Sequence, residues 1–149
     1  MKNKPLLFLL LVLISPIATS AEGMTTLVSA HSVAATVDRL EGALNEQGFR
    51  IFARIDHAGG AASVDLALPP TELLIFGKPL VGTRLMQAER SIGIDLPMKY
   101  LVWEEEDGTV FIGWNDGVWM AERHGLDAEA PVVQNVAAAL RKFASEAAQ

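Results

Sequence analysis

The clearest pattern in the chain is an apolar stripe at helical spacing between residues 33 and 44. The stripe consists of Val33, Val37, Leu40 and Leu44. Residues three or four positions apart share one face of an α-helix, so this segment predicts a helix with one buried side. Ser32 precedes it as an N-cap, and Gly48 follows where a left-handed residue commonly closes a helix. Weaker patterns of the same period predict helices over residues 58–68, 79–90, 118–124 and 129–147.

Five segments carry the short apolar or alternating runs that are typical of β-strands. They cover residues 25–29, 49–55, 72–76, 100–105 and 109–114. The Asp107-Gly108 pair between the last two runs predicts a β-hairpin, whose strands must be antiparallel. Because each predicted helix has a single apolar stripe, the order of elements predicts an α+β two-layer sandwich with an antiparallel sheet and helices packed on one face.

The first 21 residues have the pattern of a secretory signal peptide. Lys2 and Lys4 precede a nine-residue apolar run, whereas a helix that spans a bilayer needs about 20 residues. Small residues follow the run, so we expect cleavage after Ala21, with Ser20 as the alternative. Residues 22–149 are then a single domain that is periplasmic or secreted and has no membrane anchor. A buried N-terminal helix or a retained anchor is the other interpretation.

Composition and charge narrow the classes of partner. Removing residues 1–21 takes away two of the 12 basic residues and none of the 18 acidic ones, which leaves 128 residues with a net charge of −8. An acidic surface repels phosphate backbones and anionic lipids, so nucleic acid is not an expected partner. The chain has no cysteine, which excludes disulfides and thiolate chemistry. Its three histidines are scattered without metal-ligand spacing, and no cofactor is predicted.

A long, ordered motif links this chain to a known family. Residues 76–86 are FGKPLVGTRLM and residues 96–104 are LPMKYLVWE, followed by the Asp107-Gly108 turn. This combination resembles the DUF302 family of domains of unknown function, over nearly all of residues 25–143. The resemblance implies a compact antiparallel α+β sandwich that tends to form homodimers, and it implies no particular chemistry. Lys78 stands where that family usually has Asn, and Trp114 where it usually has Tyr.

The segment from Gly77 to Met86 is the strongest candidate for a ligand site. Its glycines allow close backbone approach, and Lys78, Thr83 and Arg84 supply polar groups beside a helix start that could receive an anion. Trp114 and Trp119 flank a turn and are expected to line an apolar cleft beside this segment. We therefore expect a small apolar or weakly acidic ligand between the two regions. The alternative is that the segment only turns the chain and that the tryptophans pack the core.

His57 supports a hypothesis of a different class. It follows Asp56 at the end of a predicted strand, where the two could form an acid–base pair or bind a metal. The alternative is a turn with a solvated histidine. No Ser lies in a nucleophile elbow, so no catalytic residue is predicted and an enzyme has no positive support. The leading hypothesis is a non-catalytic binding module; the alternatives are an enzyme or metal-dependent protein centred on His57, and a dimeric partner-binding or stress-response protein.

Overall fold

The structure is a computed structural model that describes residues 21–149. The predicted signal peptide therefore lies outside the described residues, apart from Ala21. The strands are β1 (Met24–Ser29), β2 (Arg50–Asp56), β3 (Thr71–Gly77), β4 (Met98–Glu104) and β5 (Val110–Asn115). The helices are α1 (Val33–Glu46), α2 (His57–Ala62), α3 (Pro79–Ala88), the 3₁₀ helix η1 (Arg90–Ile94), α4 (Gly117–Arg123) and α5 (Pro131–Ala148).

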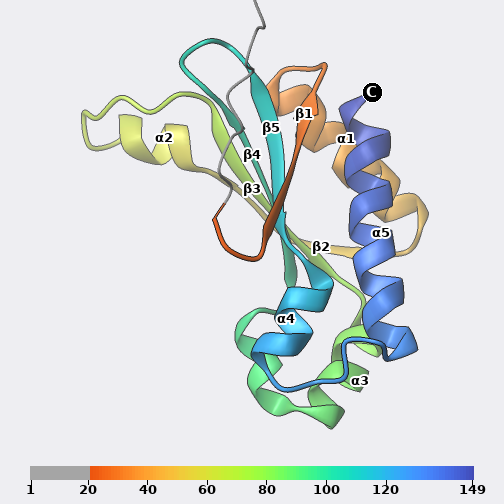
Figure 1. Ribbon diagram of the computed structural model, residues 1–149. Coiled ribbons are helices and arrows are strands. Elements are labelled where there is room, and N and C mark those ends of the chain that lie inside the picture. The colour runs from red at the N-terminus through yellow and green to blue at the C-terminus, as the bar shows by residue number, and fades with distance from the viewer. Residues whose placement is uncertain (1–20) are drawn as a thin grey trace, which may run out of the picture.

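The five strands form one antiparallel sheet in the order β1-β5-β4-β3-β2. Helices α1 and α5 lie side by side over one face of it (Figure 1). The predicted α+β two-layer sandwich is thus confirmed. The hairpin between β4 and β5 is also as predicted, because Gly108 adopts a φ of +83° in its turn, a conformation that glycine takes without strain.

The core lies between the sheet and these two helices. The predicted stripe on α1 is buried there, with Val33 at 2% exposure and Val37, Leu40 and Leu44 at 0%. Ser32 caps α1 by accepting a hydrogen bond from the Ala35 N–H at 3.4 Å, and Gly48 follows the helix with a φ of +71°. The expected cap and stop signals therefore act as predicted.

Two segments differ from the sequence-based expectation. Residues 58–68 were expected to form a helix, but helix α2 ends at Ala62 and residues 63–70 are exposed without regular structure. The reason is that Gly59-Gly60 weaken the helix and no apolar stripe holds it to the sheet. Glycine at position 93 and proline at position 97 predict an extended linker before β4, but this segment contains η1, which is capped by the Glu89 carboxylate and buries Ile92.

The second face of the sheet carries no helix in the described part of the chain. Helix α2 and the loop after it project away from the end of the sheet as an arm, residues 57–70 (Figure 1). The side chains that the strands project from this face are mostly apolar. Within residues 21–149, no helix combines the length and apolar character needed to cross a bilayer.

Tyr100 is the largest fully buried side chain, and its hydroxyl donates a 2.6 Å hydrogen bond to the Leu140 carbonyl on α5. Burial raises the pKa of its phenol, whereas in the unfolded chain the phenol ionises near pH 10. The native state therefore keeps its proton where the unfolded state loses it, so this contribution to stability is complete below about pH 10 and declines above it.

We expect Tyr100→Phe to lower the free energy of unfolding by about 1 kcal/mol at neutral pH, because the Leu140 carbonyl loses its donor. Between about pH 10 and about pH 11, the wild-type protein should lose stability more steeply than the variant, which has no phenol to ionise. Denaturant unfolding at both pH values measures this difference. Equal slopes with pH would show that the Tyr100 phenol is not buried in the native state.

Candidate functional site: an apolar cavity between two helices

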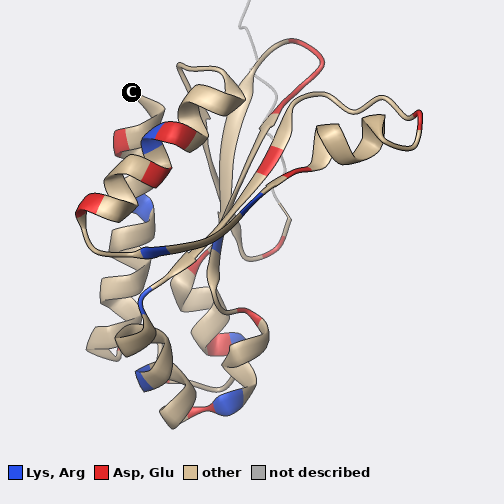
Figure 2. Cartoon of the chain, turned by 180° about the vertical axis from the view of Figure 1, so that it is seen from behind, with Lys and Arg blue, Asp and Glu red and all other residues tan. Residues whose placement is uncertain are grey.

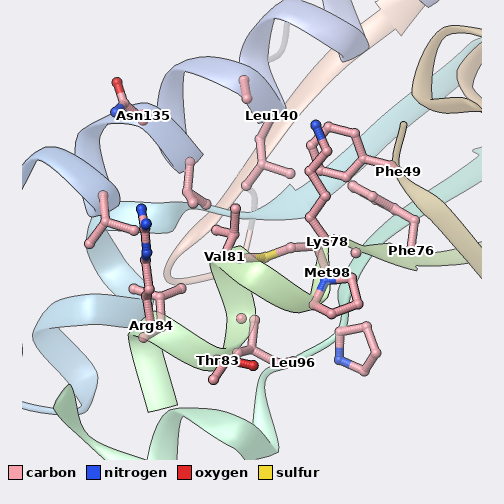
Figure 3. Close-up of a pocket in the computed structure, with 18 of the residues that line it drawn as sticks. Phe49, Phe76, Lys78, Val81, Thr83, Arg84, Leu96, Met98, Asn135 and Leu140 are labelled. Carbon is pink, nitrogen blue, oxygen red and sulfur yellow. The ribbon is translucent and has the colours of Figure 1, made fainter. Parts of the chain in front are cut away.

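A cavity of about 800 Å³ opens between α3 and α5 (Figure 3). Helix α3 forms one wall and the first half of α5 forms the opposite one. The end of β3 and the start of β4 supply Phe76 and Met98, and Phe49 comes from the residue just before β2. The volume falls within the range of about 300–1,000 Å³ that is typical of small-molecule sites.

The local sequence explains why α3 stands away from the core. Strand β3 ends at Gly77, and Pro79 starts α3 at the first helical position, where the missing N–H of proline has no cost. Helix α3 buries a single side chain, Leu85, whereas α5 buries five. A helix held by so little packing leaves space beside it, and that space is the cavity.

The interior of the cavity is apolar. The Phe49 ring forms part of the lining, with its centroid 6.0 Å from that of Phe76 and 5.4 Å from that of Phe143, both in edge-to-face geometry. The polar side chains in its lining are those of Lys78, Thr83, Arg84 and Asn135. No acidic side chain is among the described residues that line it. Such a site can desolvate the apolar body of a ligand and offers hydrogen-bond donors at its edge.

The polar residues Lys78, Thr83 and Arg84 are found together in the structure. All three line the cavity, and Figure 3 shows Lys78 and Arg84 extending from the α3 side toward α5, with Val81 between them. The Lys78 ammonium lies 4.9 Å from the ring centroid of Phe49, a cation–π distance. Arg84 is exposed and forms no ion pair with any residue that the structure describes.

The expected contribution of Trp114 and Trp119 to this site is wrong, because neither side chain lines the cavity. Trp114 is 3% exposed and meets the Tyr100 ring edge-on at 5.9 Å, since strand alternation turns it toward the helices. Trp119 lies against Gly23, where a Cβ atom would come within 2.1 Å of the indole. Trp119 also packs against the core, and the Arg123 guanidinium lies 5.5 Å from its ring centroid.

His57 lies outside the cavity as well. It is the first residue of α2, exposed on the arm. The carboxylate of Asp56 accepts a hydrogen bond from the Gly59 N–H at 2.8 Å, so it caps α2 instead of pairing with His57. In the part of the chain that the structure describes, no three His, Asp or Glu side chains gather in a way that could hold a metal ion.

Sequence reasoning missed the α5 wall of the cavity. Val132, Val136 and Leu140 line it at intervals of four residues. Their spacing predicted a buried stripe, but a helical stripe has the same appearance whether it faces a sheet or an empty space. Asn135 lies at the edge of the same wall, and no sequence pattern indicated that it would line a cavity.

A second polar cluster joins η1 to α4 and was also missed, because its members are far apart in sequence. Asp95 accepts hydrogen bonds from His124 Nε2 at 2.7 Å and from Arg123 at 2.9 Å, with the His124 and Asp95 side chains 7% and 9% exposed. The hydroxyl of Ser91 lies 2.8 Å from His124 Nδ1. The residue types are those of a hydrolytic triad.

The surroundings of Ser91 argue against such chemistry. The Glu89 carboxylate accepts a hydrogen bond from the Ser91 N–H at 2.9 Å, and hydrogen bonds from Ser91 lower the pKa of Glu89. A carboxylate beside the hydroxyl opposes the negative charge that develops on an acyl substrate, which needs donors instead. Ser91 also lies outside the lining of the cavity. The cluster therefore ties η1 to α4.

These features define a class of protein: an antiparallel α+β sandwich with a preformed apolar cavity between α3 and the C-terminal helix α5. The chain belongs to the family described as "Domain of unknown function DUF302", which matches residues 24–147. The resemblance inferred from the sequence motif is thus confirmed. The crystal structure of an uncharacterized conserved DUF302 protein from Bacillus stearothermophilus has the same fold, with a TM-score of 0.68. It is 22% identical, and the similarity covers 86% of this chain and 97% of that one.

Curated relatives are longer than this chain. Two of them, each named "Fluoride-specific ion channel FluC 1", come from Brucella suis biovar 1 (strain 1330) and Brucella abortus biovar 1 (strain 9-941). Each is 48% identical over 104 residues, or 70% of this chain. Those residues make up 41% of the Brucella suis protein and 38% of the Brucella abortus protein. The chain thus spans less than half the length of these relatives.

Proposed function

We propose that this protein is an exported, non-catalytic module that binds a small ligand with an apolar body in the cavity between α3 and α5. The observation that carries the proposal is the cavity itself, about 800 Å³ and lined almost throughout by apolar side chains. A preformed apolar site is favourable for binding because little ordering is needed when a ligand enters. Export is inferred from the pattern of residues 1–21.

Native mass spectrometry and a thermal-shift screen test this proposal together. Protein purified from its own compartment should carry a small molecule or gain thermal stability from apolar compounds in the screen. A ligand at about 100 times its Kd stabilises a native protein by about 2.7 kcal/mol, which such a screen detects readily. A bare protein that no compound stabilises would contradict the proposal.

We also propose that the protein is a homodimer in which a second copy covers the open face of the sheet. The apolar side chains on this face, inferred from strand alternation and pairing, are Val28, Ala53, Ile55, Leu73, Ile75, Leu101, Trp103 and Phe111. Five strands about 4.8 Å apart and about six residues long give roughly 480 Å². The arm adds Val64, Leu66 and Leu68, which are 63%, 67% and 44% exposed. A stable dimer buries about 800 Å² per partner, which the face and the arm together approach.

Val28→Asp should convert this dimer to a monomer. Val28 is 60% exposed on β1, and a carboxylate there would be buried without a partner in the interface. Light scattering after gel filtration measures the mass of each form. The matched control is Ala138→Asp on the exposed side of α5, which should leave the mass of the dimer unchanged. A monomeric wild-type protein would overturn the homodimer.

A second candidate function is a role beside a fluoride channel. The supporting observation is that the Brucella FluC proteins contain a stretch 48% identical to this chain. Two segments that form one protein in some organisms commonly act together when they are separate. Growth of a strain without this protein in fluoride-containing medium tests the idea. Fluoride sensitivity of that strain, reversed when the wild-type protein is restored, would support the idea, and unchanged growth would contradict it.

A further inference from the structure

The charged groups at the cavity all have one sign. Lys78 and Arg84 are the charged side chains among the described residues that line it. This is unexpected in a chain with 18 acidic and 12 basic residues. Acidic residues lie on α1, at Asp65 in the arm, at the tip of the β4–β5 hairpin and around η1 and α4, whereas α3 has none (Figure 2).

Neither cation is satisfied by a carboxylate of the described chain. Arg54, Arg123 and Lys142 each form an ion pair with an acidic side chain. Lys78 forms a cation–π contact with Phe49, and Arg84 has no ion pair among residues 21–149. Both side chains are long enough to lie along apolar surface while their charged ends stay near water. The edge of the cavity thus presents two positive charges to whatever enters.

We infer that the ligand is an amphipathic acid, a molecule with one anionic head group on an apolar body. The head group lies along the edge of the cavity that carries Lys78 and Arg84, and the apolar body extends inward toward Phe76, Met98 and Leu140 (Figure 3). This assignment rests on the proposed function, since it concerns the same cavity. A cationic ligand would meet two like charges and no carboxylate, and a neutral one would gain nothing from either charge.

The position of the charges keeps the binding of an anion favourable. Arg84 is exposed and Lys78 is half-buried, so the head group stays partly hydrated and its desolvation is incomplete. The planar guanidinium of Arg84 can donate two parallel hydrogen bonds to a carboxylate, and the Lys78 ammonium adds a second, compact positive charge farther along the same edge, beyond Val81 (Figure 3). Burial of the ligand's apolar body then supplies most of the affinity, and the cations at the edge of the cavity supply the preference for acids.

A pair of probes with the same chain, decanoate and decanol, separates these contributions. At about pH 8 the acid is ionised, and we expect it to bind at least about tenfold more tightly than the alcohol. The double variant Lys78→Gln with Arg84→Gln should bring the acid to within about twofold of the alcohol, with binding of the alcohol unchanged. Raising the salt concentration from about 50 mM to about 500 mM should weaken binding of the acid alone. The control variant Arg141→Gln, on α5 outside the cavity lining, should keep the preference.

Each outcome has a separate meaning. Equal affinity for decanoate and decanol would overturn the inference of an acidic ligand and leave the apolar binding site intact. A preference for the acid that survives in the double variant would place the head group elsewhere and also overturn it. If neither probe binds at any concentration that keeps it monomeric, the proposed function itself fails.

Discussion

Replacing Val136 by tryptophan is expected to abolish ligand binding while the fold is kept. Val136 is a half-buried residue of α5 that lines the cavity. The larger indole would occupy the space that a ligand needs, so the stabilisation of about 2.7 kcal/mol at 100 times Kd should disappear. Because the indole enters an existing space, the free energy of unfolding of the ligand-free protein should change by no more than about 1 kcal/mol.

Ala138→Trp is the matched control for this variant. Ala138 is exposed on the same helix and does not line the cavity, so the same substitution there should leave binding intact. Thermal-shift and calorimetric titrations of the three proteins give the comparison. Undiminished binding by the Val136→Trp protein would show that the ligand occupies some other part of the molecule.

Trp114→Ala is expected to lower the free energy of unfolding by about 3–5 kcal/mol, because it empties a large volume in a closed core. The Trp114 side chain is 3% exposed and lies against the buried Tyr100 ring. The sequence allowed two roles for this tryptophan, ligand contact or core packing. The structure assigns it to the core, so the loss should appear in stability and not in the affinity of the protein that remains folded.

Trp103→Ala serves as the comparison for Trp114→Ala. Trp103 lies on the next strand, half-exposed on the open face and stacked on Phe111 at 5.4 Å. Its removal creates no enclosed cavity, so denaturant unfolding in the monomeric Val28→Asp background should show a distinctly smaller loss. A cost below about 1 kcal/mol for Trp114→Ala would contradict the core assignment.

Most of the fold could be predicted from the sequence because its signals are local. The α1 stripe, the cap at Ser32 and the turn at Gly108 each depend on a few adjacent residues, and each acts as predicted. Residues 58–68 were harder, since small residues with two glycines give no periodicity strong enough to set the length of α2. The 3₁₀ helix η1 depends on Glu89 as its cap, and one acidic residue before a five-residue segment is too common a signal to predict a helix.

The candidate site could be predicted only in part. Lys78, Thr83 and Arg84 were found because a Gly-Pro turn with polar residues is visible in the sequence. Their partner was not, because the opposite wall comes from α5, more than 40 residues later in the chain. The two tryptophans were close in sequence to a turn, but strand direction and the cap at Asp116 direct them away from the cavity. Which side chains line the cavity is decided by packing between segments that are far apart in the sequence.

Methyl NMR during a titration with decanoate tests the central claim most directly. The account predicts that the resonances of methyl groups lining the cavity, including Val81, Leu85 and Val136, shift in proportion to occupancy. Methyl groups on the open face and the arm, such as Val28 and Val64, should stay in place. Shifts confined to the open face or the arm, with the cavity methyls unchanged, would contradict the account.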